Sequence, residues 1–350
     1  MSPYEDLPRR SFWKTGVARS EPGAIRDLYL KKFDITAEDR IATAGSCFAQ
    51  HITGKLRASG YAVMDMEPAP PWLPEQVQLA HGYGLFSARY GNIYTARQLL
   101  QLAREAYGEF TPSQTVWERK GRHHDAQRPT VDPRGLDSAN EVLGLRLEHV
   151  KQVRRMFSAM DVFVFTLGLT EAWMNAAGDT VYPTAPGTFA GTYRTQEYRF
   201  HNFTYPEVLE DLEAFIELIS VHNPDFRMIL TVSPVPLTAT TTDQHVLAAT
   251  VHSKSVLRAV AGQLAGNSDR VDYFPSYELI SSHVSRGALH EENLRTVSAT
   301  GVESVMKMFF SQHPVLDKHG ARAFGDAQLV PEDEDAEVRC DEELLEAFGR

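Results

Sequence analysis

The strongest constraint on the fold is an alternation, along most of the chain, of short apolar runs with longer amphipathic segments. The apolar runs are rich in Val, Ile and Phe, and they lack the in-and-out alternation of a strand with one solvent-facing side. This pattern is typical of strands in parallel sheets that are buried on both faces. We therefore predict five strands, at residues 40–44, 61–65, 161–167, 227–232 and 270–274.

The segments between these runs carry the signals of helices. In the clearest case Thr204 can cap a helix with Pro206 in its first turn, and Asn223 with Pro224 ends it. Apolar residues recur there at spacings of three and four, as on one face of a helix. Strands that alternate with helices indicate a three-layer α/β/α domain with a mostly parallel, about five-stranded sheet. Similar helical patterns cover residues 95–107, 139–160, 246–264 and 298–311.

We place this α/β domain at residues 39–315. Residues 1–38 are rich in Pro and charged residues, and we expect them to form an irregular N-terminal arm. Residues 66–160 are expected to form either an inserted helical or irregular region or a lid. Residues 316–350 are an acidic C-terminal tail, with a short helix expected over 341–348.

Charge and cysteine content exclude several classes of function. The formal net charge of -11 repels phosphate backbones, and the chain has no basic run, so we expect no nucleic-acid partner. Two cysteines, Cys47 and Cys340, cannot form a disulfide scaffold, and their spacing does not indicate a metal site. No apolar run approaches the ~18 residues that span a bilayer, and the N-terminus lacks the pattern of a secretion signal. We expect a cytoplasmic protein without a membrane partner and leave the oligomeric state open.

Residues suited to catalysis follow the predicted strands, where ligands bind in open parallel sheets. Ser46 comes directly after Gly45 and the first strand. It is either the N-cap of the next helix or a nucleophile whose own N–H helps to bind an oxyanion. Cys47 is expected to pack against the sheet, a reactive thiolate being the alternative. Gly91, before Asn92 and another helix, is either a turn residue or a second oxyanion donor.

The later strands also end in polar and aromatic residues. Thr170 and Glu171 follow the third strand, and they either face the cleft or lie in a solvated loop. His245 follows the fourth strand near the start of a helix, where an imidazole could act as a base. The residues that we expect to bind substrate at this rim are Asn92, Trp173, Tyr277 and Glu278.

Residues 45–49 read GSCFA, the signature of the GSCFA family, and the chain resembles that family over roughly residues 38–312. The agreement extends to GNIYTARQL, FTLGLTEAW, TVSPVPL, HSKSVLRAVAG and YFPSYE, in this order. The family is similar to the SGNH/GDSL hydrolases, three-layer enzymes that hydrolyse or transfer acyl esters. The resemblance implies that Ser46 is the nucleophile. It also implies that the Ser46 N–H, the Gly91 N–H and the region of Thr170 bind the oxyanion.

One part of the superfamily pattern is absent. Its Asp-x-x-His pair should lie near residues 293–296, which read Asn-Leu-Arg-Thr. A serine without a neighbouring base is a poor nucleophile. We therefore predict His245 as the base and His290 as the alternative. Glu171 or Glu278 would orient the imidazole.

Together these features predict a serine esterase or O-acyltransferase that acts on a carbohydrate or a similar small hydroxylated substrate. Hydrolysis would need no cofactor and no metal, whereas transfer would need an acyl donor such as acetyl-CoA. The alternative is a non-catalytic protein that binds a glycan or an acylated ligand in an SGNH-like cleft, and the missing Asp-x-x-His pair motivates it. Replacement of Ser46 with Ala separates the two.

Overall fold

The centre of the fold is a parallel sheet of four strands. The computed structural model describes residues 2–314 and 340–349. Every neighbouring pair of strands in the sheet is parallel, so the mostly parallel α/β sheet expected from the sequence is confirmed. In sheet order the strands are β1 (Ile41–Gly45), β4 (Val162–Leu167), β8 (Arg227–Val232) and β9 (Val271–Tyr273).

The second predicted strand, at residues 61–65, is reduced to a single bridge. Val63 pairs with Ile41 in parallel, at the edge next to β1. The ladder ends there because the chain then leaves the edge of the sheet, and Met66 N–H donates to Ser87 O at 2.8 Å. The central sheet therefore has four strands rather than about five.

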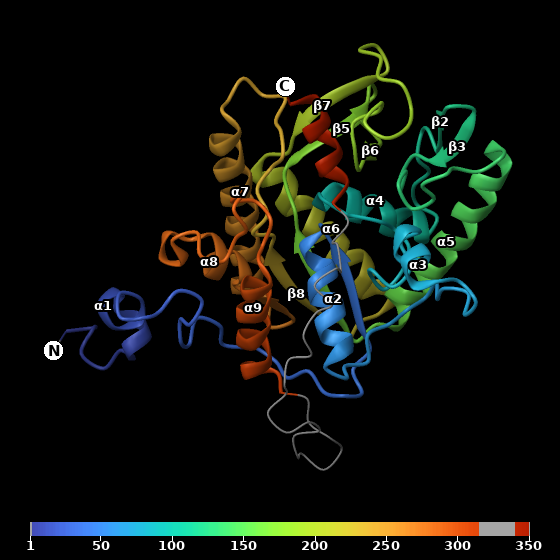
Figure 1. Ribbon diagram of the computed structural model, residues 1–350. Helices are drawn as coiled ribbons and strands as arrows, with labels where there is room; N and C mark the ends of the chain where they lie inside the picture. Colours follow the sequence, from blue (N-terminus) through green and yellow to red (C-terminus); the bar gives the residue numbers. More distant parts are fainter. Residues whose placement is uncertain (1, 315–339, 350) are drawn as a thin grey trace.

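The side chains of the sheet alternate between two hydrophobic clusters, one on each face. In β4, Phe163 and Phe165 belong to the first cluster, and Val162 and Val164 belong to the second. Helices cover both faces, which confirms the three-layer architecture (Figure 1). The first face carries α4 (Ala96–Ala106), α5 (Ala139–Ala159), α6 (Tyr205–His222) and α7 (Val246–Asn267), and the second carries α2 (Phe48–Ala58), α8 (Ser276–Ser281) and α9 (Ala299–Gln312).

Several helices begin at residues that the sequence marks as caps. Thr204 and Glu207 form a capping box at the start of α6. The side-chain oxygens of Thr95, Ser138 and Ser298 accept N–H bonds at the starts of α4, α5 and α9. A cap of this kind stabilises a helix by ~1 kcal/mol. Local sequence therefore determines where these helices start.

Residues 66–160 supply part of the helical layer. Both α4 and α5 lie in this region, and Leu99 and Phe157 pack in the cluster on the first face of the sheet. A second, antiparallel sheet that the sequence did not indicate follows β4, with strands β5 (Glu171–Asn175), β6 (Val181–Tyr182) and β7 (Tyr198–Asn202). The remaining short elements are η1 (Arg9–Ser11), α1 (Trp13–Gly16), α3 (Glu75–Ala80), β2 (Val116–Arg119), β3 (Arg122–Asp125) and η2 (His283–Ser285).

Both ends of the described chain contact the domain. In the N-terminal arm, the Tyr29 hydroxyl donates to Asp272 Oδ2 at 2.9 Å. At the other end, η3 (Asp341–Phe348) is the short helix expected there, and it lies beside the start of α2 (Figure 1). Residues 316–339 of the expected tail lie outside the described residues. Within the described ranges, no helix has the length and apolarity needed to cross a membrane.

Candidate active site

Three loops that follow parallel strands meet around one small cavity. Ser46 follows β1, Gly168 follows β4 and Ser233 follows β8, and all three line a cavity of about 10 Å³. The cavity thus lies at the carboxyl edge of the sheet, where ligands bind in open α/β proteins. Its other lining residues are Cys47, Tyr94, Leu169, Val235, Pro236, Leu237, Lys254 and Glu342.

Two glycines allow the chain to bring Ser46 to this cavity. Gly45 has a φ of +141°, and a Cβ there would collide with the carbonyl oxygen of Thr166. A Cβ on Gly168 would lie 3.1 Å from Ser46 Cβ and 3.0 Å from Tyr94 O. A larger residue at either position would therefore displace Ser46.

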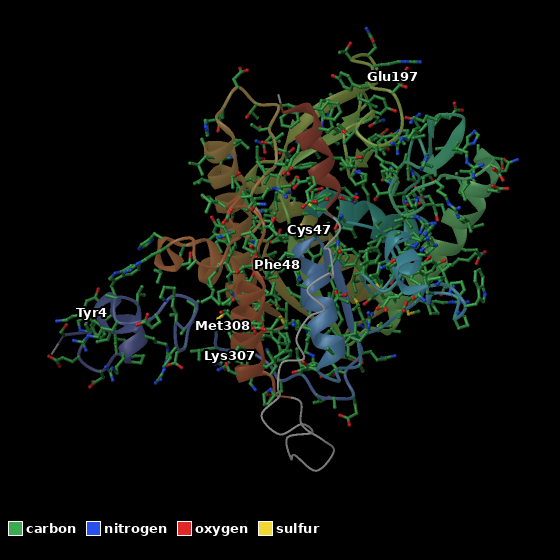
Figure 2. The ribbon with its side chains drawn as sticks, in the orientation of Figure 1. Tyr4, Cys47, Phe48, Glu197, Lys307 and Met308 are labelled. Carbon is green, nitrogen blue, oxygen red and sulfur yellow. The ribbon has the colours of Figure 1, made fainter. Side chains whose placement is uncertain are left out.

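The Ser46 hydroxyl is buried and, among the described residues, has no hydrogen-bond partner. Ser46 is 3% exposed, and its Oγ makes no hydrogen bond within the described part of the chain. It does not cap α2, because the N-cap position is Cys47, at the upper end of the helix in Figure 2, and no side chain caps there. A buried polar atom without a partner is costly and uncommon. We therefore interpret the Ser46 hydroxyl as the group that meets a ligand.

Two of the expected oxyanion donors are engaged by the fold itself. The Ser46 N–H donates to Thr166 O at 3.2 Å and so extends the β1–β4 ladder. Thr170 donates its N–H to Ser253 Oγ at 2.9 Å and its hydroxyl to Asn202 Oδ1 at 2.6 Å. Ser46 N–H and Thr170 are therefore corrected as oxyanion donors, since these hydrogen bonds leave neither group free.

At the Gly91–Asn92 segment, the Asn92 side chain lines neither cavity but is hydrogen-bonded to Asp341, which lines the larger one. Gly91 lines neither this cavity nor the larger one beside it, and a Cβ on it would face Val131. Asn92 is buried, and its Oδ1 accepts a hydrogen bond from Gln50 Nε2 at 3.1 Å. That bond orients the amide so that its Nδ2 donates to Asp341 Oδ2 at 2.9 Å.

Lys254 is the basic side chain that lines the cavity of Ser46, although it makes no hydrogen bond to the Ser46 hydroxyl. It lies in the middle of α7, is 2% exposed and lines the same cavity. Its Nζ donates to Gly168 O at 2.5 Å, and Gly168 packs against Ser46. Burial lowers the pKa of the Lys254 amine to about 8. Sequence reasoning missed Lys254, although it lies in HSKSVLRAVAG, one of the segments that carry the family resemblance.

Neither of the predicted histidine bases lines this cavity. His245 is the exposed N-cap of α7, and its Nδ1 accepts the Leu247 N–H. At 1.5 Å of rise per residue, it lies ~13 Å from Lys254 along the helix axis. His290 is half-buried and does not line the cavity. It is hydrogen-bonded to the backbone of Pro234, and burial lowers its pKa. The assignment of His245 is corrected, because capping holds its ring at the exposed helix start.

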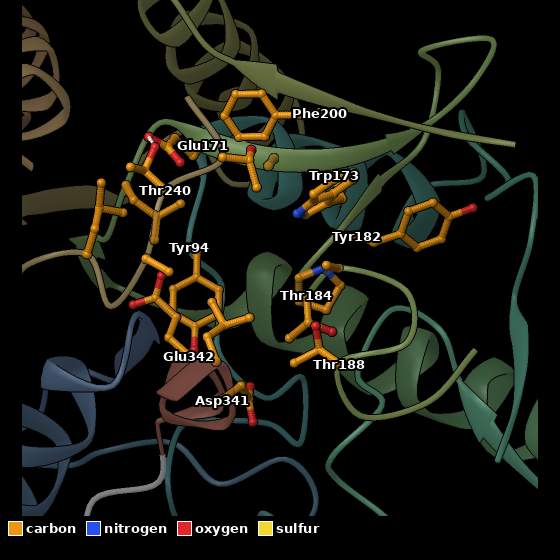
Figure 3. Close-up of a pocket in the computed structure, with 18 residues that line it drawn as sticks. Tyr94, Glu171, Trp173, Tyr182, Thr184, Thr188, Phe200, Thr240, Asp341 and Glu342 are labelled. Atoms are coloured by element: carbon orange, nitrogen blue, oxygen red, sulfur yellow. Dashed lines mark hydrogen bonds between the residues drawn. The ribbon is translucent and has the colours of Figure 1, made fainter. Parts of the chain in front are cut away.

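A larger cavity, of about 140 Å³, adjoins the site (Figure 3). Glu171 and Trp173 line it, as expected for residues that follow the third predicted strand. Glu171 Oε1 accepts a hydrogen bond from Thr240 Oγ1 at 2.8 Å, and burial raises the pKa of Glu171. The wall between the two cavities consists of the residues that line both, which are Tyr94, Leu169, Leu237 and Glu342.

Tyr277 and Glu278 do not join the site. Glu278 accepts the Tyr273 hydroxyl at 2.8 Å and pairs with Arg258, while Tyr277 packs against the cluster on the first face. Their expected place at the rim is corrected, because α8 begins at Ser276 and packs both against the domain. Among residues 2–314 and 340–349, no group of three or more His, Cys, Asp or Glu side chains is arranged to hold a metal ion.

The C-terminal segment, residues 340–349, covers the site. Glu342 lines both cavities, and its Oε2 lies 3.7 Å from Nη2 of Arg295. Burial raises the pKa of Glu342 to about 7, although the charges of Arg295 and Lys254 act in the opposite direction. Asp341 accepts the hydrogen bond of Asn92 described above. Access to Ser46 therefore depends on this segment.

Cys47 contacts the same segment. It is 4% exposed, lines the cavity of Ser46 and is hydrogen-bonded to Cys340. This bond, together with burial, raises the pKa of the Cys47 thiol. Cys47 is therefore buried, and its partner comes from the C-terminal segment.

Comparisons with known proteins bear on the family. A family model described as the GSCFA family matches residues 40–309. No curated protein matches this chain in sequence.

Three solved structures show weak similarity, at TM-scores too low to support a conclusion about this chain. A carbohydrate esterase family 3 protein from Talaromyces cellulolyticus is 10% identical at a TM-score of 0.25, over 63% of this chain and 89% of that chain. A carbohydrate esterase family 2 enzyme from Corynascus thermopiles is 14% identical at a TM-score of 0.29, over 80% of this chain and 68% of that chain. An acetyl xylan esterase from Butyrivibrio proteoclasticus is 12% identical at a TM-score of 0.24, over 69% of this chain and 56% of that chain.

Proposed function

This chain belongs to the GSCFA family, and we propose that it is an enzyme that hydrolyses or transfers acyl esters through Ser46, with Lys254 as the base. The observation that supports this most directly is the buried Ser46 hydroxyl without a partner, in the same cavity as the Lys254 amine. A serine nucleophile paired with a lysine base occurs on unrelated folds. Lysine suits this role when burial lowers its pKa towards neutrality.

In the proposed reaction, neutral Lys254 accepts the Ser46 hydroxyl proton while Oγ attacks the acyl carbonyl carbon. The Lys254 ammonium then gives its proton to the leaving alcohol oxygen. Water, or a hydroxyl group of an acceptor, attacks the resulting acyl-serine ester with the same base. Hydrolysis releases the acid, and transfer releases the new ester.

The oxyanion would be stabilised by the start of α2, and by the Asn92 amide once the segment that carries its partner Asp341 has moved away. Ile93 N–H donates to Gly45 O at 2.8 Å, which brings the neighbouring Asn92 close to Ser46. The first N–H groups of a helix have no acceptor within that helix, so those at Cys47 and Phe48 are suited to bind negative charge. Such donors commonly contribute the largest part of catalysis in acyl transfer.

The larger cavity supports an ester of a carbohydrate or a similar hydroxylated compound as substrate. Its lining combines aromatic rings with threonine hydroxyls, and sugar rings present both apolar faces and hydroxyl groups. Hydrolysis requires only water, whereas transfer would take the acyl group from a donor such as acetyl-CoA. The lining residues in question are Trp173, Tyr182, Thr184, Thr188 and Phe200 (Figure 3).

Turnover of a panel of acyl esters by the full chain tests this proposal. We expect Ser46→Ala to abolish turnover and Lys254→Met to lower kcat/KM by ~10²–10⁴-fold, the usual contribution of a general base. His245→Asn is the matched control, because Asn is a good N-cap and the change removes only the imidazole; turnover should be unchanged. Turnover that survives Ser46→Ala would refute the proposal. Ligand binding without turnover in any form would favour the binding-protein alternative.

A further inference from the structure

The two cysteines of this chain meet at the candidate active site. Cys47 begins α2, and Cys340 begins the C-terminal segment, so they come from opposite ends of the sequence. Both are free thiols, 4% and 7% exposed. They are hydrogen-bonded to each other, and Cys47 also lines the cavity of Ser46. Two thiols in contact are the reactants of a disulfide.

The surroundings of the pair assign different roles to the two thiols. Nη2 of Arg295 lies 3.3 Å from Cys340 Sγ. The hydrogen bond from Cys47 and the nearby charge of Arg295 lower the pKa of Cys340, whereas the hydrogen bond to Cys340 and burial raise the pKa of Cys47. The thiolate is the nucleophile in thiol–disulfide exchange. Cys340 is therefore the sulfur that reacts first with an oxidant.

We propose that Cys47 and Cys340 form a reversible disulfide that fixes residues 340–349 over the cavity of Ser46. The oxidant is a low-molecular-weight disulfide. The Cys340 thiolate attacks one of its sulfurs, which forms a mixed disulfide and releases one thiolate. Cys47 then loses its proton, and its sulfur attacks Cys340 Sγ and releases the second thiolate. The protein gives up two electrons and two protons, and the small disulfide becomes two thiols.

The bond would hold in place contacts that already cover the site. Asp341 accepts a hydrogen bond from Asn92, and the Glu342 carboxylate lies in the wall between the two cavities. In the reduced chain only noncovalent contacts retain the segment, these and the contacts of Arg295 with Cys340 and Glu342. In the oxidised chain the segment cannot leave Cys47, so Ser46 stays covered. The structure thus connects the redox state of two thiols to the access of one hydroxyl.

Peptide mapping of the full chain after incubation with oxidised glutathione tests the proposal. Free thiols are blocked by alkylation, and trypsin then releases Cys47 in peptide 41–55 and Cys340 in peptide 340–350. We expect these two peptides to be cross-linked, with the loss of two hydrogen atoms, and to separate after treatment with dithiothreitol. Because docking raises the effective concentration of the two thiols, the cross-link should form more than about tenfold faster in the folded chain than in urea.

Two outcomes would overturn the proposal, and both are independent of whether Ser46 is catalytic. The first is a folded chain in which both cysteines remain alkylated, or Cys340 carries only glutathione, while the chain in urea forms the cross-link. The second is a cross-link between two copies of peptide 41–55, in the original chain as in Cys340→Ser, because the disulfide would then join two chains. That variant changes one atom in a segment outside the hydrophobic clusters, so loss of folding does not obscure the result.

The covering effect is measured on the same samples. We expect oxidation to slow the reaction of Ser46 with a fluorophosphonate at least about tenfold, and dithiothreitol to restore it, whereas Cys340→Ser should react at one rate throughout. A cross-linked chain in which Ser46 reacts as fast as in the reduced chain would overturn the covering role. Absence of Ser46 labelling in every sample would instead count against the catalytic proposal and leave the peptide map to decide the disulfide.

Discussion

At the scale of the residue, the proposed reaction depends on the protonation state of the Lys254 amine. The amine is removed from water, which favours the neutral form, whereas Glu342 and the thiol of Cys47 nearby favour the ammonium form. The balance gives a pKa of about 8, well below that of an exposed lysine. Part of the amine is therefore neutral, and able to accept a proton, close to neutral pH.

The titration of Lys254 should respond to Glu342. We expect the Lys254 side chain, followed by NMR with labelled lysine, to titrate near pH 8, and Glu342→Gln to move the midpoint to lower pH because a negative charge is lost. Glu346→Gln is the control, since it removes the same charge from an exposed position of η3. A midpoint at the pH of exposed lysines, or no response to Glu342→Gln, would contradict the described balance.

The proposed nucleophile could be predicted from the sequence, and its proposed base could not. Ser46 follows a glycine at the end of an apolar strand, and that local pattern is sufficient to place it at the carboxyl edge of the sheet. Lys254 reaches the site from the middle of a helix. Its position depends on how α7 packs beside Gly168, which no local pattern records. His245 follows a strand, which makes it a candidate base in the sequence, but in the fold its ring caps α7.

At the scale of the element, the docking of η3 should weaken as pH rises. The pKa of Glu342 is about 7 in the docked segment, above its ordinary value, so the docked form holds the proton more tightly. This contribution to docking is complete below the ordinary pKa and is lost as pH rises through about 7. We expect hydrogen exchange of residues 340–349, corrected for intrinsic rates, to increase between pH 6 and 8.

Glu342→Gln isolates the cause of that change. The variant keeps the size of the side chain but cannot titrate, so its hydrogen exchange over residues 340–349 should vary much less with pH. The charged or titratable groups that act on Glu342 are Glu171, Lys254, Arg295 and Asp341. Exchange with the same pH dependence in both proteins would assign the effect to one of these groups and refute the role of Glu342.

A buried ion cluster joins α5 to α4 and β3. Arg146 Nη1 lies 3.1 Å from both carboxylate oxygens of Asp125, and its Nε lies 2.8 Å from Glu105 Oε1. Removal of one partner from a buried ion pair costs ~3–5 kcal/mol. We expect Arg146→Met to lower the free energy of unfolding in urea by ~3 kcal/mol, and Arg155→Met, on the exposed side of α5, to change it by less than ~0.5 kcal/mol. Equal effects of the two substitutions would contradict this.

Helices were easier to predict than strands. Capping residues and apolar spacing are local signals, and they located α4, α5, α6, α7 and α9. Whether a strand forms depends on which sheet edge is free to pair with it, and that is a property of the assembled sheet. This applies to the strand expected at 61–65 and to the antiparallel strands β5–β7.

At the scale of the whole molecule, the site is assembled from segments distant in sequence. Ser46, Asn92 and Lys254 come from the domain, and Glu342 comes from the C-terminal segment. The sequence predicted the helix at 341–348 but assigned the tail to solvent, because acidic composition is typical of solvated tails. Its docking rests on contacts with Asn92 and Arg295, which exist only in the folded chain.

The reaction of Ser46 with a fluorophosphonate, located by peptide mapping, tests the central claim most directly. It is measured under reducing conditions on the full chain and on a chain that ends at residue 339. The account predicts a label on peptide 41–55 that Ser46→Ala abolishes, that Lys254→Met slows by at least ~10²-fold, and that His245→Asn leaves unchanged. The shortened chain should react faster. Absence of a label at Ser46 in both chains, or equal rates with and without the Lys254 amine, would contradict the account.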